Sequence, residues 1–280
     1  MIVFLNGRFV PEAEAMVSVF DRSFLYGDGL FETLHVYGGK PFRWAEHLER
    51  LERGAAFLKI KLPFAVEELW NHALQLVERN AMPESLLRIT LSRGVGLRGY
   101  SPKGANQPTL VMSLHEAPDT GGKRPTGWRV ITASCRLPAN EALAQFKTCN
   151  KLPQILARAE ADAAGADEAL LLNTDGKIVE ASSSNLFWIR DGAVGTPPLQ
   201  SGILAGVTRL VTLEICRELE LPAQEENITP EELQRVEGMF LSLSSWGIVE
   251  VVALDEQPVA RSAWTERIRG AYEKLVQTRP

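Results

Sequence analysis

The side chain with the clearest chemical potential is Lys147, which lies in the run Phe-Lys-Thr-Cys-Asn at residues 146–150, on the approach to a predicted helix. Its neighbours are apolar or small, and a lysine shielded from water loses part of its preference for the charged form. A neutral amine is what a Schiff-base lysine needs. An ordinary solvated lysine at a helix start is the alternative, and this run by itself leaves both open.

Two other segments carry groups that could bind a charged ligand. Glu180 is a lone carboxylate between two predicted strands, followed closely by three serines at 182–184. Farther along, Gly206 immediately precedes a predicted helix that begins Val-Thr-Arg at 207–209. Free backbone N–H groups at such a start form a ready site for an anion.

Other motifs give weaker evidence of function. Residues 94–99 (Gly-Val-Gly-Leu-Arg-Gly) have the spacing of a dinucleotide fingerprint, but Pro102 and Pro108 predict irregular chain where that motif needs a helix. Asn227-Ile228-Thr229 matches a glycosylation acceptor, yet Thr229 followed by Pro230 favours a helix cap. The four histidines and three cysteines show no metal or disulfide spacing, and no Gly-x-Ser-x-Gly elbow is present. We therefore expect no metal and no serine hydrolase.

Charge and hydropathy narrow the class of protein. The 30 Lys and Arg against 35 Asp and Glu give a net charge of −5, without a basic run that nucleic acid or an anionic membrane would need. No apolar run reaches the roughly 18 residues that span a bilayer, and the first residues do not resemble a secretion leader. We expect a cytoplasmic protein with neither nucleic-acid nor membrane partners.

Periodicity predicts a mixture of strands and helices rather than a regular alternation, which indicates an α+β fold. A tight hairpin is expected around Asn6-Gly7. The turn formers at 118–127 predict a linker between a smaller domain, 1–117, and a larger domain, 128–280. The expected strands cover 2–5, 8–10, 30–37, 85–92, 109–114, 128–135, 168–172, 178–181, 185–189, 239–242 and 248–253, and the expected helices 44–58, 66–78, 151–164, 207–218 and 263–276.

Four separated motifs, in a fixed order, together resemble the fold-type IV pyridoxal-phosphate enzymes. That family includes branched-chain and D-amino-acid aminotransferases, R-amine transaminases and aminodeoxychorismate lyases. The motifs are Tyr-Gly-Asp-Gly-Leu-Phe-Glu at 26–32, His-Leu-Glu-Arg-Leu at 47–51, Lys-Thr-Cys-Asn at 147–150, and Glu180 to Asn185 with Gly-Val-Thr-Arg at 206–209. The resemblance covers nearly the whole chain and implies a smaller N-terminal α/β domain and a larger C-terminal domain with a β-barrel-like core.

Carried over to these residues, the resemblance implies that Lys147 holds pyridoxal 5'-phosphate as a Schiff base and moves the proton. Glu180 would face the pyridine nitrogen and keep it protonated. The remaining implied cofactor contacts are Arg50, Val207, Thr208 and Ser244 at the phosphate and Leu204 on one face of the ring. Taken singly, Arg50 could be a plain surface residue, Glu180 a turn carboxylate, Thr208 a first-turn cap and Ser244 a strand-end hydroxyl.

The resemblance also implies substrate residues, but it leaves the subgroup open. Phe31, Thr33 and Ser245 are candidates for the pocket, and Arg98 and Tyr100 for a substrate carboxylate. The chain departs from the branched-chain pattern at Thr33, usually Gly, and at Leu152, commonly Tyr. It departs from the D-amino-acid pattern at Phe31, usually Tyr, and at Tyr100, usually His. Residues 93–101, 147–152 and 244–248 lean toward the lyase.

We expect an aminotransferase that moves an amino group from an amino acid or amine to a 2-oxo acid, as a homodimer with its active site near the subunit interface. An aminodeoxychorismate lyase releasing 4-aminobenzoate and pyruvate is the alternative, with the same cofactor and lysine. A pyridoxal-phosphate binding protein without activity is a more remote one.

Overall fold

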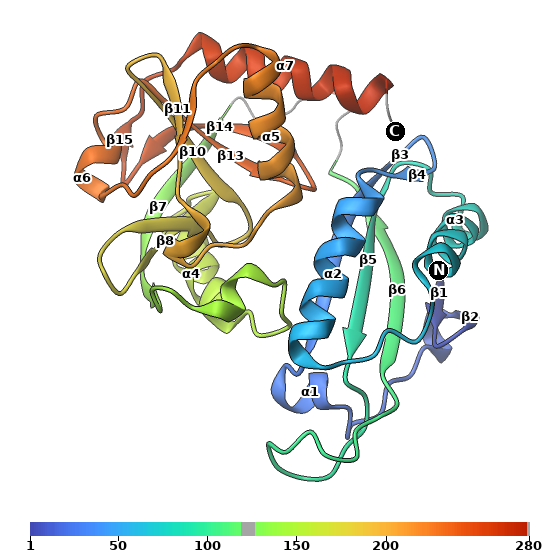
Figure 1. Ribbon diagram of the computed structural model, residues 1–280. Helices are drawn as coiled ribbons and strands as arrows, with labels where there is room; N and C mark the ends of the chain where they lie inside the picture. The colour runs from blue at the N-terminus through green and yellow to red at the C-terminus, as the bar shows by residue number, and fades with distance from the viewer. Residues whose placement is uncertain (119–126, 279–280) are drawn as a thin grey trace. The chain divides into compact units, whose positions relative to one another are not determined.

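A computed structural model describes residues 1–118 and 127–278 (Figure 1). Its described residues form two compact units. Unit 1 comprises residues 1–118, the segment Phe146–Asn150 and the last turn of the C-terminal helix, and unit 2 comprises the rest. The predicted linker at 118–127 lies almost wholly outside the described residues, so the predicted domain boundaries stay a prediction.

Unit 1 is built on an antiparallel sheet with the strand order β2-β1-β6-β5-β3-β4. The predicted hairpin at Asn6-Gly7 is confirmed: Leu5 pairs with Arg8, and both turn residues have positive φ, 47° and 90°. A two-residue turn of this kind matches the twist of the strands it joins. The strands are β1 (Ile2–Leu5), β2 (Arg8–Pro11), β3 (Gly29–Tyr37), β4 (Lys40–Pro41), β5 (Ser85–Ser92) and β6 (Thr109–Glu116).

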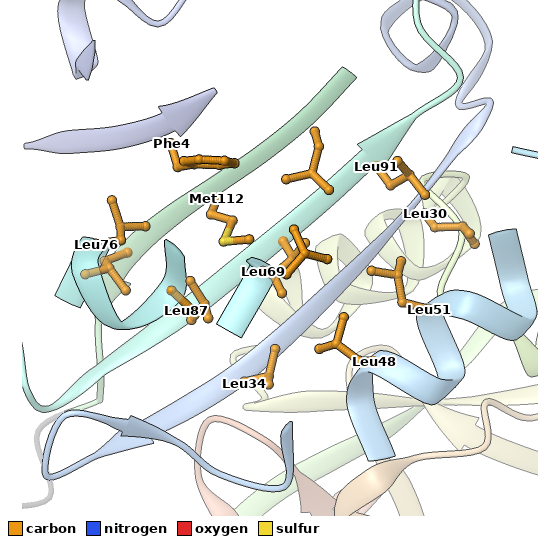
Figure 2. Packing of buried hydrophobic residues seen from close by; sticks show 14 of the residues in the cluster. Phe4, Leu30, Leu34, Leu48, Leu51, Leu69, Leu76, Leu87, Leu91 and Met112 are labelled. Carbon is orange, nitrogen blue, oxygen red and sulfur yellow. The ribbon is translucent and has the colours of Figure 1, made fainter. Parts of the chain in front are cut away.

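Two helices cover this sheet and form its hydrophobic core with it. They are α2 (Trp44–Leu58) and α3 (Val66–Asn80), while the shorter α1 (Arg22–Tyr26) precedes β3. Leu48 and Leu51, one helical turn apart on α2, pack against Leu30 and Leu34 of β3 in one cluster (Figure 2). Side chains alternate along a strand, so the residues between Leu30 and Leu34 divide between two faces, and Glu32 shares the core face.

Unit 2 contains a closed ring of six strands, in the order β10-β13-β14-β7-β8-β9. The ring closes because β9 returns to β10, where Glu180 pairs with Asn185. The expectations of an α+β fold and of a barrel-like core are confirmed. The ring strands are β7 (Trp128–Leu137), β8 (Glu168–Asn173), β9 (Ile178–Ala181), β10 (Asn185–Arg190), β13 (Gly238–Leu243) and β14 (Gly247–Leu254), with β11 (Ala193–Thr196), β12 (Ala223–Glu225) and β15 (Gln257–Pro258) attached.

The helices of unit 2 begin where local sequence predicts. α4 (Leu152–Ala163) tolerates Pro153 in its first turn, where a missing N–H is harmless. Thr229 caps the short α6 (Pro230–Leu233), as expected, and its hydroxyl accepts from the backbone N–H of Glu232 at 3.3 Å. The other two helices are α5 (Val207–Glu218) and α7 (Ala263–Thr278). Within residues 1–118 and 127–278, no helix is long and apolar enough to cross a membrane.

Candidate active site

Lys147 belongs to a short segment that extends the sheet of unit 1 beside β3. The backbone N–H of Phe31 donates to the carbonyl of Lys147 at 2.8 Å, and that of Cys149 donates to Gly29 at 2.9 Å. Lys147 is half-buried, and its Nζ lies 4.7 Å from the centroid of the Phe31 ring. The structure therefore brings together the predicted Schiff-base lysine and a predicted pocket residue, and a ring face attracts the cationic form of that lysine.

Arg88 is a member of this group that the sequence reasoning missed. It pairs with Thr33 across the β3–β5 ladder, and its guanidinium carbon lies 4.0 Å from the Phe31 ring centroid. Burial lowers the pKa of Arg88, yet a guanidinium stays charged at neutral pH. The alternation of β5 separates Arg88 from the buried Leu87 and Ile89 and could have indicated it, but only the strand register shows that it meets Thr33.

Arg50 is not a surface residue, because its side chain is only 4% exposed. Its Nε and Nη2 donate to the two carboxylate oxygens of Glu32 at 2.8 and 2.6 Å, a paired geometry that fixes the guanidinium plane. Nδ1 of His47 lies 2.7 Å from the same carboxylate. The sequence motifs contain Glu32 and His47, but no pattern assigned them this task.

The charges of this cluster are set by opposing effects. Burial alone would raise the pKa of Glu32, but Arg50 and then His47 outweigh it and lower that pKa to about 2. Burial lowers the pKa of His47 below its ordinary value; the hydrogen bond and charge of Glu32 oppose this shift, and the positive charges of Arg50 and Lys147 add to it. At neutral pH the cluster is therefore one carboxylate, one guanidinium and a neutral imidazole whose Nδ1 carries the proton.

Arg98 and Tyr100 lie on the long loop between β5 and β6, and both side chains are exposed, Tyr100 by 88%. The loop is irregular, as predicted from its prolines. The Tyr100 ring meets the Tyr26 ring edge-on at 5.7 Å between centroids. Within this single chain, these two predicted carboxylate-binding residues do not join the buried group around Phe31.

In unit 2, Glu180 and Leu204, two of the predicted cofactor residues, lie in contact. The backbone N–H of Leu204 donates to Oε2 of Glu180 at 2.8 Å, so the carboxylate has a defined orientation at the end of β9. Asn185 reinforces this, because its amide donates to the Leu204 carbonyl at 3.0 Å and its backbone pairs with Glu180. Asn185 belongs to one of the sequence motifs, but its spacing gave no sign of this role.

The other predicted cofactor contacts of unit 2 lie at the start of α5 and in the turn between β13 and β14. Gly206 is the N-cap of α5 and offers no side-chain acceptor to the amides of Val207 and Thr208. A Cβ on Gly206 would meet Oδ1 of Asn185 at 2.0 Å, so the close approach requires glycine. Ser244 and Ser245 lie, half-buried, in the tight turn between β13 and β14, where Leu243 pairs with Gly247.

A second buried carboxylate, Glu168, holds the serine run that follows Glu180. The hydroxyls of Ser182 and Ser183 donate to its two oxygens, the latter at 2.6 Å. This anchors the β9–β10 turn and with it the strand ends that carry Glu180 and Asn185. The sequence gives no local sign of it, since the partners are 14 and 15 residues apart.

Comparison with known proteins places these residues in context. The family model described as amino-transferase class IV matches residues 29–254. The chain is 34% identical to a Methanocaldococcus jannaschii protein provisionally named a branched-chain-amino-acid aminotransferase, over 100% of this chain and 96% of that one. It is 31% identical to the D-alanine aminotransferase of Staphylococcus aureus MSSA476, over 99% and 98%.

Solved structures of aminotransferases and of a protein named as a lyase are also similar to this chain. The branched-chain aminotransferase of Thermoproteus uzoniensis, solved with norvaline, aligns with a TM-score of 0.93 at 31% identity, over 99% of this chain and 95% of that one. A Legionella pneumophila protein provisionally named a 4-amino-4-deoxychorismate lyase aligns at 0.87 and 27% identity, over 94% and 96%. Both of the reactions that the sequence leaves open therefore occur among the names of similar structures.

Proposed function

Since this chain belongs to the class IV aminotransferases, which are pyridoxal-phosphate enzymes, we propose that Lys147 holds the cofactor as a Schiff base and that the enzyme moves an amino group from an amino acid or amine to a 2-oxo acid. The observation that carries this is the placement of Lys147, which is half-buried on a segment hydrogen-bonded to β3, with its Nζ 4.7 Å from the centroid of the Phe31 ring.

The residues of the candidate site fit pyridoxal phosphate. Arg50, the amides of Val207 and Thr208 and the Ser244 hydroxyl are the groups that we assign to the phosphate, and Leu204 would contact the ring. Two features of this chain support a preformed site for the phosphate and the ring. Asn185 leaves room only for glycine at the N-cap of α5, and the two hydrogen bonds to Glu32 hold the Arg50 guanidinium in one orientation. Glu180, oriented by the Leu204 N–H, is assigned to the pyridine nitrogen.

The proposed mechanism divides the work among these side chains. When bound, pyridoxal phosphate withdraws electrons from the substrate carbon that loses its proton and accepts the amino group. The Glu180 carboxylate would keep the ring nitrogen protonated, since a nearby negative charge stabilises that cation. Lys147, once its amine is displaced, would carry the proton as a general base and then as an acid. Arg50 would neutralise the phosphate and fix its position.

Substrate contacts are assigned by chemistry. Phe31 offers an apolar surface for a side chain, and Thr33 and Ser245 offer hydroxyls. Three cations or donors suit a carboxylate: Arg88 beside Phe31 and, on the β5–β6 loop, Arg98 and Tyr100. The two loop residues are exposed in the single chain, so we propose that they act in an assembly of more than one copy.

A homodimer with its active site near the subunit interface is the assembly we propose. Unit 1 exposes a group of apolar side chains around α1 and the β5–β6 loop, which the Asp21–Val95 bridge joins. Exposed groups of this kind mark sites of association. Its members are Val19, Phe20, Phe24, Leu25, Val95, Leu97 and Tyr100.

A spectral half-reaction tests the proposed function. The yellow holoenzyme is mixed singly with L-leucine, L-glutamate, D-alanine and R-1-phenylethylamine, without an oxo acid, and the absorbance of the cofactor is followed. We expect at least one donor to convert it to the pyridoxamine form and so to identify the donor class and its handedness. Lys147→Ala should abolish the conversion, while the exposed control Lys61→Ala should retain it.

The lyase remains the second candidate, because a structure of that name resembles this chain and because Thr33 and Leu152 depart from the branched-chain pattern. Aminodeoxychorismate would then yield pyruvate and 4-aminobenzoate while the yellow form persists, and no donor would convert it. A protein that only binds the cofactor would do neither. A preparation that stays colourless after pyridoxal phosphate is added would exclude all three.

A further inference from the structure

The side chain of Arg22 is almost fully buried, with 4% exposure, and it spans an unusual set of acceptors. Its Nε donates to Oδ2 of Asp28 at 2.7 Å. Its Nη1 donates to the carbonyls of Gly99 and Ser101 at 2.9 and 3.2 Å, and its Nη2 to that of Tyr100 at 3.0 Å. One guanidinium thus binds three consecutive backbone carbonyls of the β5–β6 loop, and one carboxylate fixes the guanidinium.

The rest of the loop is tied to the same short helix. The backbone N–H of Arg22 donates to the Gly94 carbonyl at 2.9 Å, and the N–H of Gly99 donates to the Tyr26 hydroxyl at 3.2 Å. A Cβ on Gly96 would meet Cδ of Arg22 at 2.9 Å. Long loops without regular structure are commonly functional and need such anchors to hold one conformation. The anchored carbonyls, 99–101, include Tyr100 and directly follow Arg98.

We propose that Arg22 is a positioning residue for substrate recognition: by holding the 99–101 backbone, it presents Arg98 and Tyr100 to the carboxylate of the substrate. This inference rests on the proposed function, in which those two side chains receive that carboxylate. It assigns Asp28, the acid of the Tyr-Gly-Asp-Gly motif, the task of orienting Arg22. Lysine cannot replace Arg22, because a single ammonium lacks the planar fork that reaches all four acceptors.

The test compares ligands that carry a carboxylate with one that does not. Arg22→Lys and the exposed control Arg53→Lys are prepared as holoenzymes. For Arg22→Lys we expect the KM of the reacting amino acid to rise about tenfold with kcat within about twofold of the parent. The KM of R-1-phenylethylamine and the Kd of pyridoxal phosphate should not change. The control should match the parent in every measurement.

A binding readout without turnover uses 4-methylvaleric acid, titrated against the absorbance of the bound cofactor. Its Kd should rise about tenfold in Arg22→Lys. In an Arg98→Ala background the same substitution should change that Kd less than twofold, because coupled residues are not additive. Hydrogen exchange of the holoenzyme should show faster exchange at 94–104 and unchanged exchange in β3. If Arg22→Lys yields no holoenzyme, Tyr26→Phe is used instead, because it removes the hydroxyl that accepts the Gly99 N–H. It should raise the same KM and Kd values two- to threefold.

The outcomes separate the inference from the function on which it rests. Equal losses for amino acids and amine, additivity with Arg98→Ala, or an unchanged Kd for 4-methylvaleric acid would each overturn it. An Arg98→Ala enzyme that binds carboxylates like the parent would also overturn it, while the half-reaction of the parent leaves amino transfer standing. If the parent converts no donor, the proposed function fails, and the 4-methylvaleric acid titration still decides the role of Arg22.

Discussion

Asp28 and Glu32 lie four residues apart, one just before β3 and the other within it, and each accepts hydrogen bonds from two other side chains. Glu32 receives both of its partners, His47 and Arg50, from the rigid helix α2. Asp28 receives the Nε of Arg22 and that of Arg93 at 2.7 and 2.8 Å on one oxygen. Arg22 leads to the backbone of the β5–β6 loop, and Arg93 leads to the end of α2. The first cluster fixes the Arg50 side chain, and the second holds the β5–β6 loop and the end of α2.

The two clusters also differ in burial. The Glu32 side chain is 1% exposed and that of Asp28 is 15% exposed. Removing one partner of a fully buried ion pair leaves a charge that water cannot reach, whereas a group nearer the surface can be rehydrated. Burial of the carboxylate should therefore set how much stability a mutation removes, while the location of its partners should set which function is lost.

Glu32→Gln should have the largest effect, because it leaves the Arg50 guanidinium buried without a carboxylate. We expect the free energy of unfolding to fall by about 3–5 kcal/mol. Urea unfolding of the cofactor-free protein measures it, with Glu52→Gln, exposed on the same helix, as the control expected to change by under about 0.5 kcal/mol. A loss below about 1 kcal/mol would show that the cluster is not as dry as its exposure indicates.

Lowering the pH should reproduce much of this loss in the free energy of unfolding without a mutation. The pKa of Glu32 in the folded protein, about 2, lies below its ordinary value of 4.5, so its contribution is complete above pH 4.5 and is lost as pH falls toward 2. The shift corresponds to about 3 kcal/mol. The lowered pKa of His47 adds a loss that begins nearer its ordinary 6.5, since protonation favours the unfolded chain.

Urea unfolding measured at a series of pH values checks whether stability falls with pH in these two ranges. Glu32→Gln should flatten the decline between pH 4.5 and 2, and His47→Gln the decline that begins near pH 6.5. Stability that rises as pH falls through either range would contradict the assigned protonation states.

Asp28→Asn should have an intermediate effect on stability and a local effect on structure. Hydrogen bonds between charged groups contribute about 1.5–3 kcal/mol, and the amide retains an acceptor, so we expect a loss near the lower end, about 1.5 kcal/mol. Limited proteolysis should cut within 93–108 sooner than in the parent. Cleavage elsewhere first, or a loss as large as that of Glu32→Gln, would remove the distinction between the clusters.

Arg93→Lys should have the smallest effect. Arg93 joins Asp28 to the end of α2, where its Nη2 donates to the Leu58 carbonyl at 2.9 Å, and lysine can keep one of these contacts. We expect a loss of about 1 kcal/mol and an unchanged KM, because Arg93 does not bind the 99–101 carbonyls. A KM change like that of Arg22→Lys would mean that the whole Asp28 cluster, rather than Arg22, positions the loop.

Much of the fold follows from local pattern. Asn6-Gly7 specifies its hairpin because both residues tolerate positive φ, and Leu48, Leu51 and Ala55 specify α2 because they recur on one helical face. Thr229 and Pro230 specify a helix start for the same local reason. Four short motifs in a fixed order were enough to indicate the family.

What the sequence by itself determined is therefore most of the longer helices and strands and the family, while α1, β4, β11, β12 and β15 were not predicted and the roles of Lys147 and Glu180 stay predictions. Only the tertiary structure decided that residues 146–150 pair with β3, that Thr33 pairs with Arg88, that the β9–β10 pairing closes the barrel, and that Glu32 and Asp28 hold Arg50 and Arg22. The physical reason is the sequence distance over which each interaction acts. Helix and turn preferences act over three or four residues, whereas these contacts join segments brought together by burial of the core, and nothing in the spacing of their residues encodes the strand register that results.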